Sequence, residues 1–201
     1  MIMYGASGHG KVILEILESN NDTDIRVWDD AVKPDMWEYR VQKPLPPGSP
    51  MPGKMVISIG VNATRKRVAE RFASSVEFGT AIHADAYISK RATVDEGTVV
   101  MAGVRINPDT KVGKHCIVNT CASIDHDCLL ADFVHISPNA TLSGDVHVGE
   151  GTHIGSGASV IQGIRIGKWC TIGAGAAVVR DIPDYATAVG VPAKVIKTKQ
   201  V

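Results

Sequence analysis

The chain has 201 residues, and its 21 lysine and arginine residues balance 21 aspartate and glutamate residues to give a formal net charge of zero. Without a basic stripe, the sequence argues against a nucleic-acid partner. No apolar run approaches the roughly 18 residues of a membrane-spanning helix, and the N-terminal sequence lacks the basic and apolar regions of a signal peptide. We therefore expect a cytoplasmic protein with no membrane partner, whose four cysteines stay reduced because they lack both CxxC spacing and the density of a secreted scaffold.

Residues 1–80 predict a small Rossmann-like α/β domain, in which strands alternate with helices. Strands are expected over residues 1–5, 24–30 and 54–62, which are apolar in their middles. Helices are expected over 10–20 and 63–75, where apolar residues recur with helical spacing. The proline-rich segment 32–53 predicts an irregular connection between the second and third strands.

A glycine-rich turn, GASGHG at residues 5–10, follows the first strand and opens the first helix. That is the context of a phosphate-binding turn, but its G-x-x-G-x-G spacing differs from the dinucleotide pattern, so NAD is not expected. Asp29 and Asp30 end the second strand about twenty residues on, where an acid can hold a ribose or the polar edge of a base. The alternative is that these glycines only shape the turn.

From Ile82 onward every sixth residue is Ile, Val or Leu, for seventeen consecutive positions ending at Val178. Neither an α-helix nor an alternating strand has this period, whereas a parallel β-helix does. Three hexads make one triangular coil, so residues 81–201 predict a prism of nearly six coils, about 27 Å long at roughly 4.8 Å strand spacing. An ordinary β-sandwich with accidental spacing is the alternative. Three cysteines fall at small, inward-facing positions and are expected in the core: Cys116, Cys128 and Cys170.

An Asp-His-Asp triplet, Asp125 to Asp127, stands between two ladder residues of this run and is expected at an outward turn. A neutral histidine can accept a proton near pH 7, and a neighbouring carboxylate can fix its tautomer and raise its basicity. Both acids are candidates for that partner of His126. Residues eighteen apart stack on successive coils, so Gly144 is expected beside His126, where its missing side chain would admit a substrate and its N–H could bind an oxyanion. A solvated surface turn is the alternative.

The hexads and the terminal GVPAK, residues 190–194, resemble the bacterial hexapeptide acyltransferases. Over almost the whole chain the sequence resembles one subfamily, the nucleotide-linked 4-amino-sugar N-acetyltransferases and the related sialic-acid O-acetyltransferases. The motifs that carry this resemblance, in order, are YGASGHGKV, the Asp29–Asp30 pair, SIGVNATRKRV, VNTCASIDHDC, FVHISPNATLSG and VVRDIPDYATAVGVPAK.

This resemblance implies a left-handed β-helix, acetyl-coenzyme A as cosubstrate, a nucleotide-sugar acceptor and a homotrimer with active sites between subunits. It implies His126 as general base and Asp127 as its partner, at a position where relatives often have glutamate. The residues that it assigns to the coenzyme are His135, Gly144, Ser156, Ala174 and Pro192. Those that it assigns to the nucleotide-sugar are Ser7, Gly8, His9, Asp29, Asp30, Gly60 and Asn62. His153, which stacks on His135, is expected to face solvent.

The leading functional hypothesis is N-acetylation of a nucleotide-linked 4-amino-4,6-dideoxysugar, with UDP as the expected nucleotide, for a surface glycan or protein glycosylation. O-acetylation of sialic acid or a similar sugar is the second hypothesis, and a non-enzymatic scaffold is the third. A zinc site like that of the gamma-class carbonic anhydrases is not expected, because the paired-histidine spacing of those enzymes is missing. No metal is therefore predicted.

Overall fold

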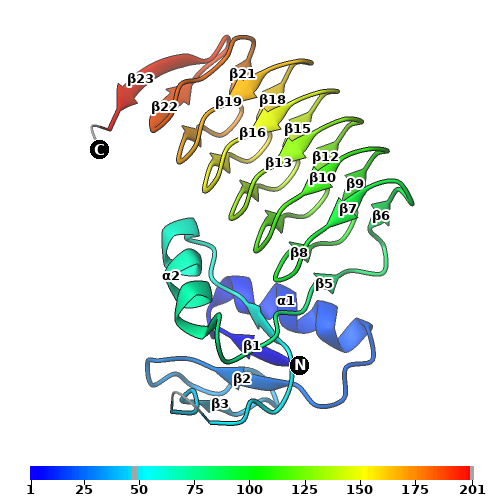
Figure 1. Ribbon diagram of the computed structural model, residues 1–201, viewed down its shortest axis with the longest axis vertical. Coiled ribbons are helices and arrows are strands. Elements are labelled where there is room, and N and C mark those ends of the chain that lie inside the picture. Colours follow the sequence, from blue (N-terminus) through cyan, green and yellow to red (C-terminus); the bar gives the residue numbers. More distant parts are fainter. Residues whose placement is uncertain (47–48, 200–201) are drawn as a thin grey trace.

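Figure 1 shows a computed structural model in which an α/β unit lies at one end of a three-sided parallel β-solenoid. It describes residues 1–46 and 49–199. Positions 47–48 of the predicted irregular connection and 200–201 of the predicted second domain lie outside those residues. Neither helix of the described residues has the length and apolar character that crossing a bilayer requires.

The N-terminal unit is a parallel sheet flanked by two helices, as the sequence predicts. Its strands are β1 (Ile2–Tyr4), β2 (Arg26–Trp28), β3 (Val41–Gln42) and β4 (Met55–Ile57), in the order β3-β2-β1-β4, and its helices are α1 (Gly8–Ser19) and α2 (Asn62–Phe72). The prediction of an irregular connection over 32–53 is wrong at β3, which pairs with β2. A strand of two residues is too short to show any period, and tertiary pairing rather than local pattern forms it.

The order of these strands creates a crevice at one end of the sheet. The chain passes from β3 at the edge, across β2 and β1, to β4 on the other side of β1. In open parallel sheets, ligands bind beyond the carboxyl ends of the strands where the strand order reverses. The residues that follow β1, β2 and β4 therefore border the expected binding crevice.

The solenoid consists of short strands that stack into three sheets, one for each side of the prism, and all their pairings are parallel except that of β22 with the terminal β23, which is antiparallel. The eight-stranded sheet contains β5 (Ala81–Ile82), β8 (Val99–Val100), β11 (Ile117–Val118), β14 (His135–Ile136), β17 (His153–Ile154), β20 (Thr171–Ile172), β22 (Ala186–Val189) and β23 (Lys194–Thr198). The six-stranded sheet contains β6 (Tyr87–Ile88), β9 (Arg105–Ile106), β12 (Ser123–Ile124), β15 (Thr141–Leu142), β18 (Ser159–Val160) and β21 (Ala177–Val178). The five-stranded sheet contains β7 (Thr93–Val94), β10 (Lys111–Val112), β13 (Leu129–Leu130), β16 (His147–Val148) and β19 (Arg165–Ile166).

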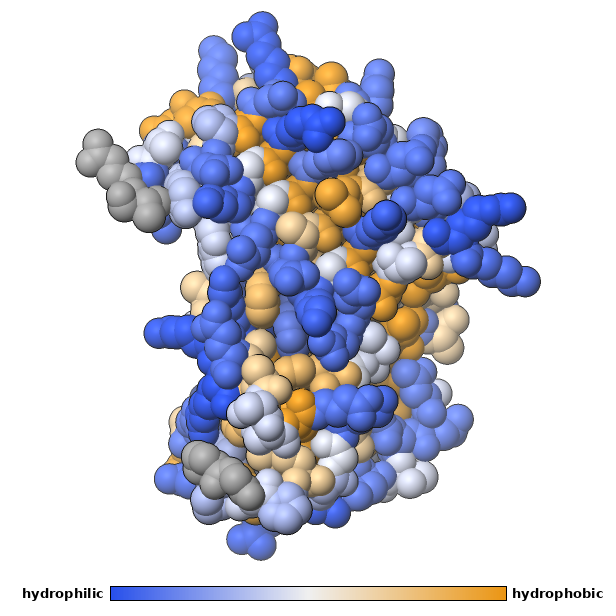
Figure 2. Space-filling view, in the orientation of Figure 1, coloured by the Kyte–Doolittle hydropathy of each residue, from blue (hydrophilic) through white to orange (hydrophobic). Residues whose placement is uncertain are grey.

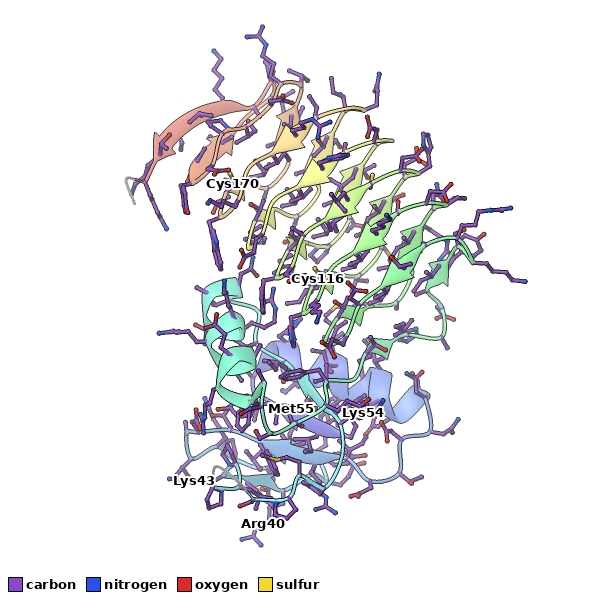
Figure 3. All side chains as sticks on the ribbon, in the orientation of Figure 1. Arg40, Lys43, Lys54, Met55, Cys116 and Cys170 are labelled. Carbon is purple, nitrogen blue, oxygen red and sulfur yellow. The ribbon has the colours of Figure 1, made fainter. Side chains whose placement is uncertain are left out.

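The predicted hexad ladder forms the core of this prism. Residues eighteen apart pair on successive coils, as Ile124 does with Ile106 and Leu142. The second residue of each repeat strand is the ladder residue and points inward, and the small residues between strands are buried beside it. Cys116, Cys128 and Cys170 are buried there as predicted, and Figure 3 shows the first and last of them on the solenoid.

Helix α1 covers part of the outer surface of the eight-stranded sheet. The outward residues Val99 and Ile117 are buried against Ile13 and Leu17 of this helix. On the five-stranded sheet, which no other described segment covers in this way, an equivalent outward position is the exposed Lys111. The N-terminal unit is therefore fixed to one particular side of the prism, and this decides which solenoid residues can share a site with it.

Candidate active site

The Asp-His-Asp triplet lies at the corner between the six-stranded and five-stranded sheets, in the turn that joins β12 to β13. The His126 Nδ1 lies 2.7 Å from the Asp127 Oδ2. Asp127 has a φ of 60°, a left-handed conformation that aspartate tolerates, and this turn lets neighbouring side chains meet. Asp125 instead accepts the His126 backbone N–H at 2.9 Å and the Asn107 amide at 2.8 Å. Of the two candidate acids, Asp127 is thus the one that contacts the ring.

The environment of His126 favours its protonated form. Its pKa is raised above the ordinary value by the hydrogen bond with Asp127 and by the negative charge of Asp125. The side chain is 57% exposed, so a substrate could reach it. With Nδ1 directed at the carboxylate, Nε2 is the nitrogen left to accept a proton.

Gly144 lies directly beside the His126 ring, as the eighteen-residue stacking predicts. A Cβ at this position would come within 2.6 Å of the ring Cε1 and 2.7 Å of Nε2. The expectation that the bare glycine leaves space for a substrate needs correction, because the imidazole itself fills that space. Both residues border an open hollow of about 470 Å³, which also includes Asp145 and Gln162.

The other residues assigned to the coenzyme do not all lie together. Ser156 and Ala174 stack at the opposite edge of the six-stranded sheet, where the Gly175 N–H donates to the Ser156 carbonyl at 2.8 Å. Pro192 lies in the loop between β22 and β23. The backbone N–H of Ala193, which follows it, donates to the Ala177 carbonyl of β21 at 2.7 Å. Gly144 and these three positions therefore flank one side of the prism. His135 lies on another side.

A pocket of about 700 Å³ opens where the carboxyl ends of β1, β2 and β4 face the eight-stranded sheet. Six residues that the sequence assigned to ligands line it: Ser7, Asp29, Asp30, Gly60, Asn62 and His135. We call this the crevice pocket. Gly8 borders a neighbouring hollow together with Lys11 and Lys33. The structure thus brings most of the predicted nucleotide-sugar residues together in one pocket. His135, which was assigned to the coenzyme, lies in this pocket and not beside Gly144.

The two acids that end β2 are held by protein groups at the mouth of this pocket. Asp29 accepts the backbone N–H groups of Ala6 at 2.8 Å and Ala31 at 2.9 Å. Asp30 accepts the Tyr4 hydroxyl and pairs with Arg71 at 2.9 Å. Burial and the hydrogen bond with Asp30 raise the pKa of Tyr4. Both carboxylates are therefore held in place by protein groups and shape the pocket mouth.

The first turn of α1 is arranged like an anion-binding helix start. Ser7 precedes it without a side-chain cap, and no acid occurs in the first turn; among the described residues the nearest carboxylate contact is that of Asp29 with the Ala6 N–H, which lies before the helix. Gly10 is required by packing, because a Cβ there would meet the Gly5 carbonyl at 2.6 Å. Gly8 faces open space, which leaves room for a ligand close to the backbone.

Three histidines form a neutral cluster beside the crevice pocket. The His135 and His153 rings stack with centroids 4.7 Å apart, and the His9 ring lies 6.4 Å from His135. Burial lowers the pKa of His9 to about 4 and that of His135 to about 3, and it also lowers the pKa of His153. The expectation that His153 faces solvent is wrong: it lines the pocket, and its Nε2 lies 2.7 Å from the Ser137 hydroxyl. The cover of the N-terminal unit explains the difference.

Two further residues at this pocket were missed from sequence. Arg65 of α2 is fully buried behind the pocket wall, and its helical spacing from Val68 and Phe72 was the signal that could have revealed it. Trp169 lines the pocket, and its ring lies so close to Gly151 that a Cβ there would approach ring carbons to 2.5 Å. The eighteen-residue stacking of a glycine under a tryptophan was the signal for this pair.

The His126 corner and the crevice pocket lie on opposite sides of the prism. The crevice pocket opens against the eight-stranded sheet, and the corner joins the other two sheets. One chain therefore does not bring the candidate base to its own crevice pocket. Within the part of the chain that the structure describes, no group of three His, Cys, Asp or Glu side chains is placed to hold a metal ion.

Family models match a segment in each of the two parts of the chain. Residues 1–72 match the family described as PglD N-terminal domain. Residues 145–180 match the family described as bacterial transferase hexapeptide, six repeats. A curated relative, the UDP-N-acetylbacillosamine N-acetyltransferase of Bacillus subtilis, is 45% identical over 106 residues, which span 47% of this chain and 47% of that protein. That aligned segment is about half the length of the curated relative.

Solved structures match the whole fold. The acetyltransferase domain of PglB from Neisseria gonorrhoeae FA1090, in complex with acetyl coenzyme A, is 37% identical with a TM-score of 0.92, covering 97% of this chain and 98% of that chain. PerB from Caulobacter crescentus, in complex with CoA and GDP-perosamine, is 36% identical with a TM-score of 0.89, covering 98% and 96%. A histidine-to-asparagine variant of the Caulobacter crescentus perosamine N-acetyltransferase, with the same two ligands, is 33% identical with a TM-score of 0.91, again covering 98% and 96%.

Proposed function

The chain belongs to the amino-sugar N-acetyltransferases of the hexapeptide acyltransferase superfamily, and from this membership we propose that it acetylates the amine of a nucleotide-linked 4-amino-4,6-dideoxysugar. Acetyl-coenzyme A would be the acetyl donor. We also propose that the enzyme works in the cytoplasm, and its free cysteines agree with that location. The observation that carries the proposal is the His126–Asp127 pair beside Gly144, an accessible base with its orienting acid on this scaffold.

The proposed reaction is a direct transfer without an acyl-enzyme. The neutral amine attacks the thioester carbon while the His126 Nε2 takes the proton that the amine loses. The carbon–sulfur bond then breaks, and the proton passes from His126 to the departing sulfur of the coenzyme. The Gly144 N–H makes no backbone hydrogen bond among the described residues, and we assign it to the oxyanion of the tetrahedral intermediate.

The crevice pocket would hold the nucleotide part of the acceptor. The diphosphate belongs at the uncapped first turn of α1, where Ser7 borders both the crevice pocket and the neighbouring hollow at Gly8, and the ribose or base belongs near the ends of β1 and β2. UDP is our proposal for the nucleotide, although PerB and the perosamine N-acetyltransferase were solved with a GDP-linked sugar. The sugar would extend from the pocket toward a catalytic base.

That base has to come from another copy of the chain, because each chain's own His126 lies on the far side of its prism. We therefore propose a homotrimer in which the His126 corner of one copy meets the crevice pocket of the next. Figure 2 shows apolar residues on the solenoid surface between polar side chains, and exposed apolar residues of the six- and five-stranded sides, such as Leu129 and Ile161, could form such contacts.

Mixing two inactive variants tests the shared site. His126→Ala removes the base, and Gly8→Glu adds a carboxylate in open space where the diphosphate is expected. Mixed and reassembled one to one, the two variants should recover activity at about a quarter of the sites, because each site draws its base and its pocket from different copies. Recovery of none would contradict the shared site.

The direct test of the function measures free thiol released from acetyl-coenzyme A in the presence of candidate acceptors. UDP- and GDP-linked 4-amino-4,6-dideoxysugars should support thiol release, and free sialic acid should not. His126→Ala should lose this release while it still binds the nucleotide-sugar. Release with sialic acid alone would instead establish an O-acetyltransferase, and no release with any acceptor would reject the proposed activity.

A further inference from the structure

Arg65 is a charged side chain in an unusual position for a soluble protein. It lies on the inner face of α2, and none of its surface is exposed. Each of the other arginines of the chain is at least partly exposed. Arg71, on a different face of the same helix, shows the usual arrangement: its guanidinium reaches the surface and pairs with the Asp30 carboxylate at 2.9 Å.

All hydrogen-bond partners of Arg65 among the described residues are neutral oxygens. They are the carbonyls of His115 at 2.7 Å, Ile59 at 2.9 Å, Gly60 at 3.2 Å and Phe133 at 2.9 Å, with the Asn62 side-chain oxygen at 2.9 Å. These contacts satisfy the guanidinium geometrically and tie segment 59–62 to two turns of the solenoid. None of them cancels its charge.

A buried charge without a countercharge is costly, and proteins normally pair it. Desolvation lowers the pKa of Arg65 to about 10, which still leaves it charged at neutral pH. Its charge also contributes to the lowered pKa of the neighbouring imidazoles His9, His135 and His153, which are neutral at pH 7. The interior beside the crevice pocket therefore carries one positive charge that nothing nearby compensates within the described residues.

The charge lies directly behind the pocket wall. Three of the groups that Arg65 contacts, Ile59, Gly60 and Asn62, also line the crevice pocket. The two acids at the pocket mouth do not contact Arg65: Asp30 is paired with Arg71, and Asp29 accepts two backbone N–H groups. An anion in the pocket would thus be separated from the guanidinium by a single residue, a distance at which a partly buried pair is weakly screened.

We propose that Arg65 is a positioning residue that fixes segment 59–62 against the solenoid and supplies the buried positive charge that selects a diphosphate in the crevice pocket. The inference rests on the proposed nucleotide-sugar substrate. It adds to the helix start of α1 a second source of positive potential, and it explains why a fully buried arginine here contacts carbonyls instead of a carboxylate.

Binding of UDP and uridine by calorimetry separates the charge from the fork of hydrogen bonds. Arg65→Lys keeps the positive charge but cannot form the five hydrogen bonds of the guanidinium, and Arg65→Gln loses both the charge and this set of hydrogen bonds. The wild type should bind UDP much more tightly than uridine; Arg65→Lys should keep that ratio within about threefold, and Arg65→Gln should reduce it at least tenfold, or about 1.4 kcal/mol. The matched control is Arg67→Gln, which removes a charge from the exposed face of the same helix and should leave the ratio unchanged.

Other outcomes overturn the inference. If each of the variants Arg65→Lys and Arg65→Gln loses affinity for UDP and for uridine by the same factor, Arg65 has a structural role only. If Arg65→Gln does not fold, the Arg65 Nε–H resonance of the wild-type protein decides: a shift on adding UDP but not uridine supports the proposal, and no shift with either overturns it. Wild-type protein that binds neither UDP nor GDP would instead reject the proposed function itself.

Discussion

Replacing Gly144 by alanine should disable the candidate base without unfolding the solenoid. The new Cβ would lie 2.6 Å from the His126 Cε1 and 2.7 Å from Nε2, whereas carbon atoms in contact prefer about 3.5–4.0 Å. The ring must therefore withdraw by about 1 Å or more. Gly144 does not have a positive φ, so alanine adds no backbone strain there.

The magnitude follows from where the ring can go. The His126 side chain is 57% exposed and can swing into solvent, so the free energy of unfolding should change by no more than about 0.5 kcal/mol. Catalysis depends on the position of the base, and a misplacement of about 1 Å can cost on the order of 10²-fold in rate. We expect kcat/KM for thiol release to fall by about that factor.

Two controls make this result specific. Because Gly144→Ala acts through His126, the double variant with His126→Ala should be no less active than His126→Ala alone. Gly113→Ala creates a similar clash at another corner, 2.6 Å from the Asp132 Oδ1, and should lower Tm more than it lowers kcat/KM. Wild-type activity in Gly144→Ala, or losses that multiply in the double variant, would refute the reasoning.

Three further predictions concern pH and the pocket. The pKa of His126 is raised, so the wild-type kcat/KM should fall as pH decreases through a value above 6.5; Asp127→Asn should move that fall to lower pH and reduce the maximum by about 10² or more. His115, buried between Phe78 and Phe133, has its pKa lowered to about 4 by burial, so the unfolded state takes up its proton first as pH falls. His115→Phe should therefore lose about 2 kcal/mol less free energy of unfolding than the wild type between pH 7 and pH 5 in urea titrations, and an equal loss would contradict this. Trp169→Ala should raise KM for the nucleotide-sugar about tenfold and leave KM for acetyl-coenzyme A unchanged, because a stacked ring contributes about 1–3 kcal/mol; an unchanged KM for both substrates would count against a role in the pocket.

The solenoid could be predicted closely because its period constrains every coil. An aliphatic residue at each sixth position has no alternative fold that buries it so regularly, and the eighteen-residue register then places Gly144 beside His126 and His153 beside His135. The same register leaves the direction of turn side chains open. A left-handed residue recurs at this turn position in successive hexads, as at Cys121, Asp127 and Phe133. That Asp127 rather than Asp125 contacts the ring depends on how the two side chains are directed within the turn, which the sequence does not reveal.

The contacts between the two parts of the chain were the main thing that sequence patterns could not supply. His153 was expected in solvent because its strand position is outward, and only the N-terminal unit on the eight-stranded sheet turns that position into a pocket wall. Arg65 reads as one of several basic residues in α2, although four of its five acceptors are backbone carbonyls. Such partners leave no trace in side-chain patterns, so the sequence pointed to six residues of the pocket lining and missed Arg65 behind them.

The regularity of the solenoid also explains why a second copy is needed for the proposed chemistry. One coil takes eighteen residues, and His126 precedes His135 by nine, so half a coil separates the candidate base from the pocket wall. Because the coils stack in register, moving either histidine by whole coils would leave both on the same sides. Only an insertion that changes the phase, or another chain, can bring His126 to the crevice pocket. The ladder from Ile82 to Val178 has no such insertion, which is the physical reason for placing the active site between copies of the chain.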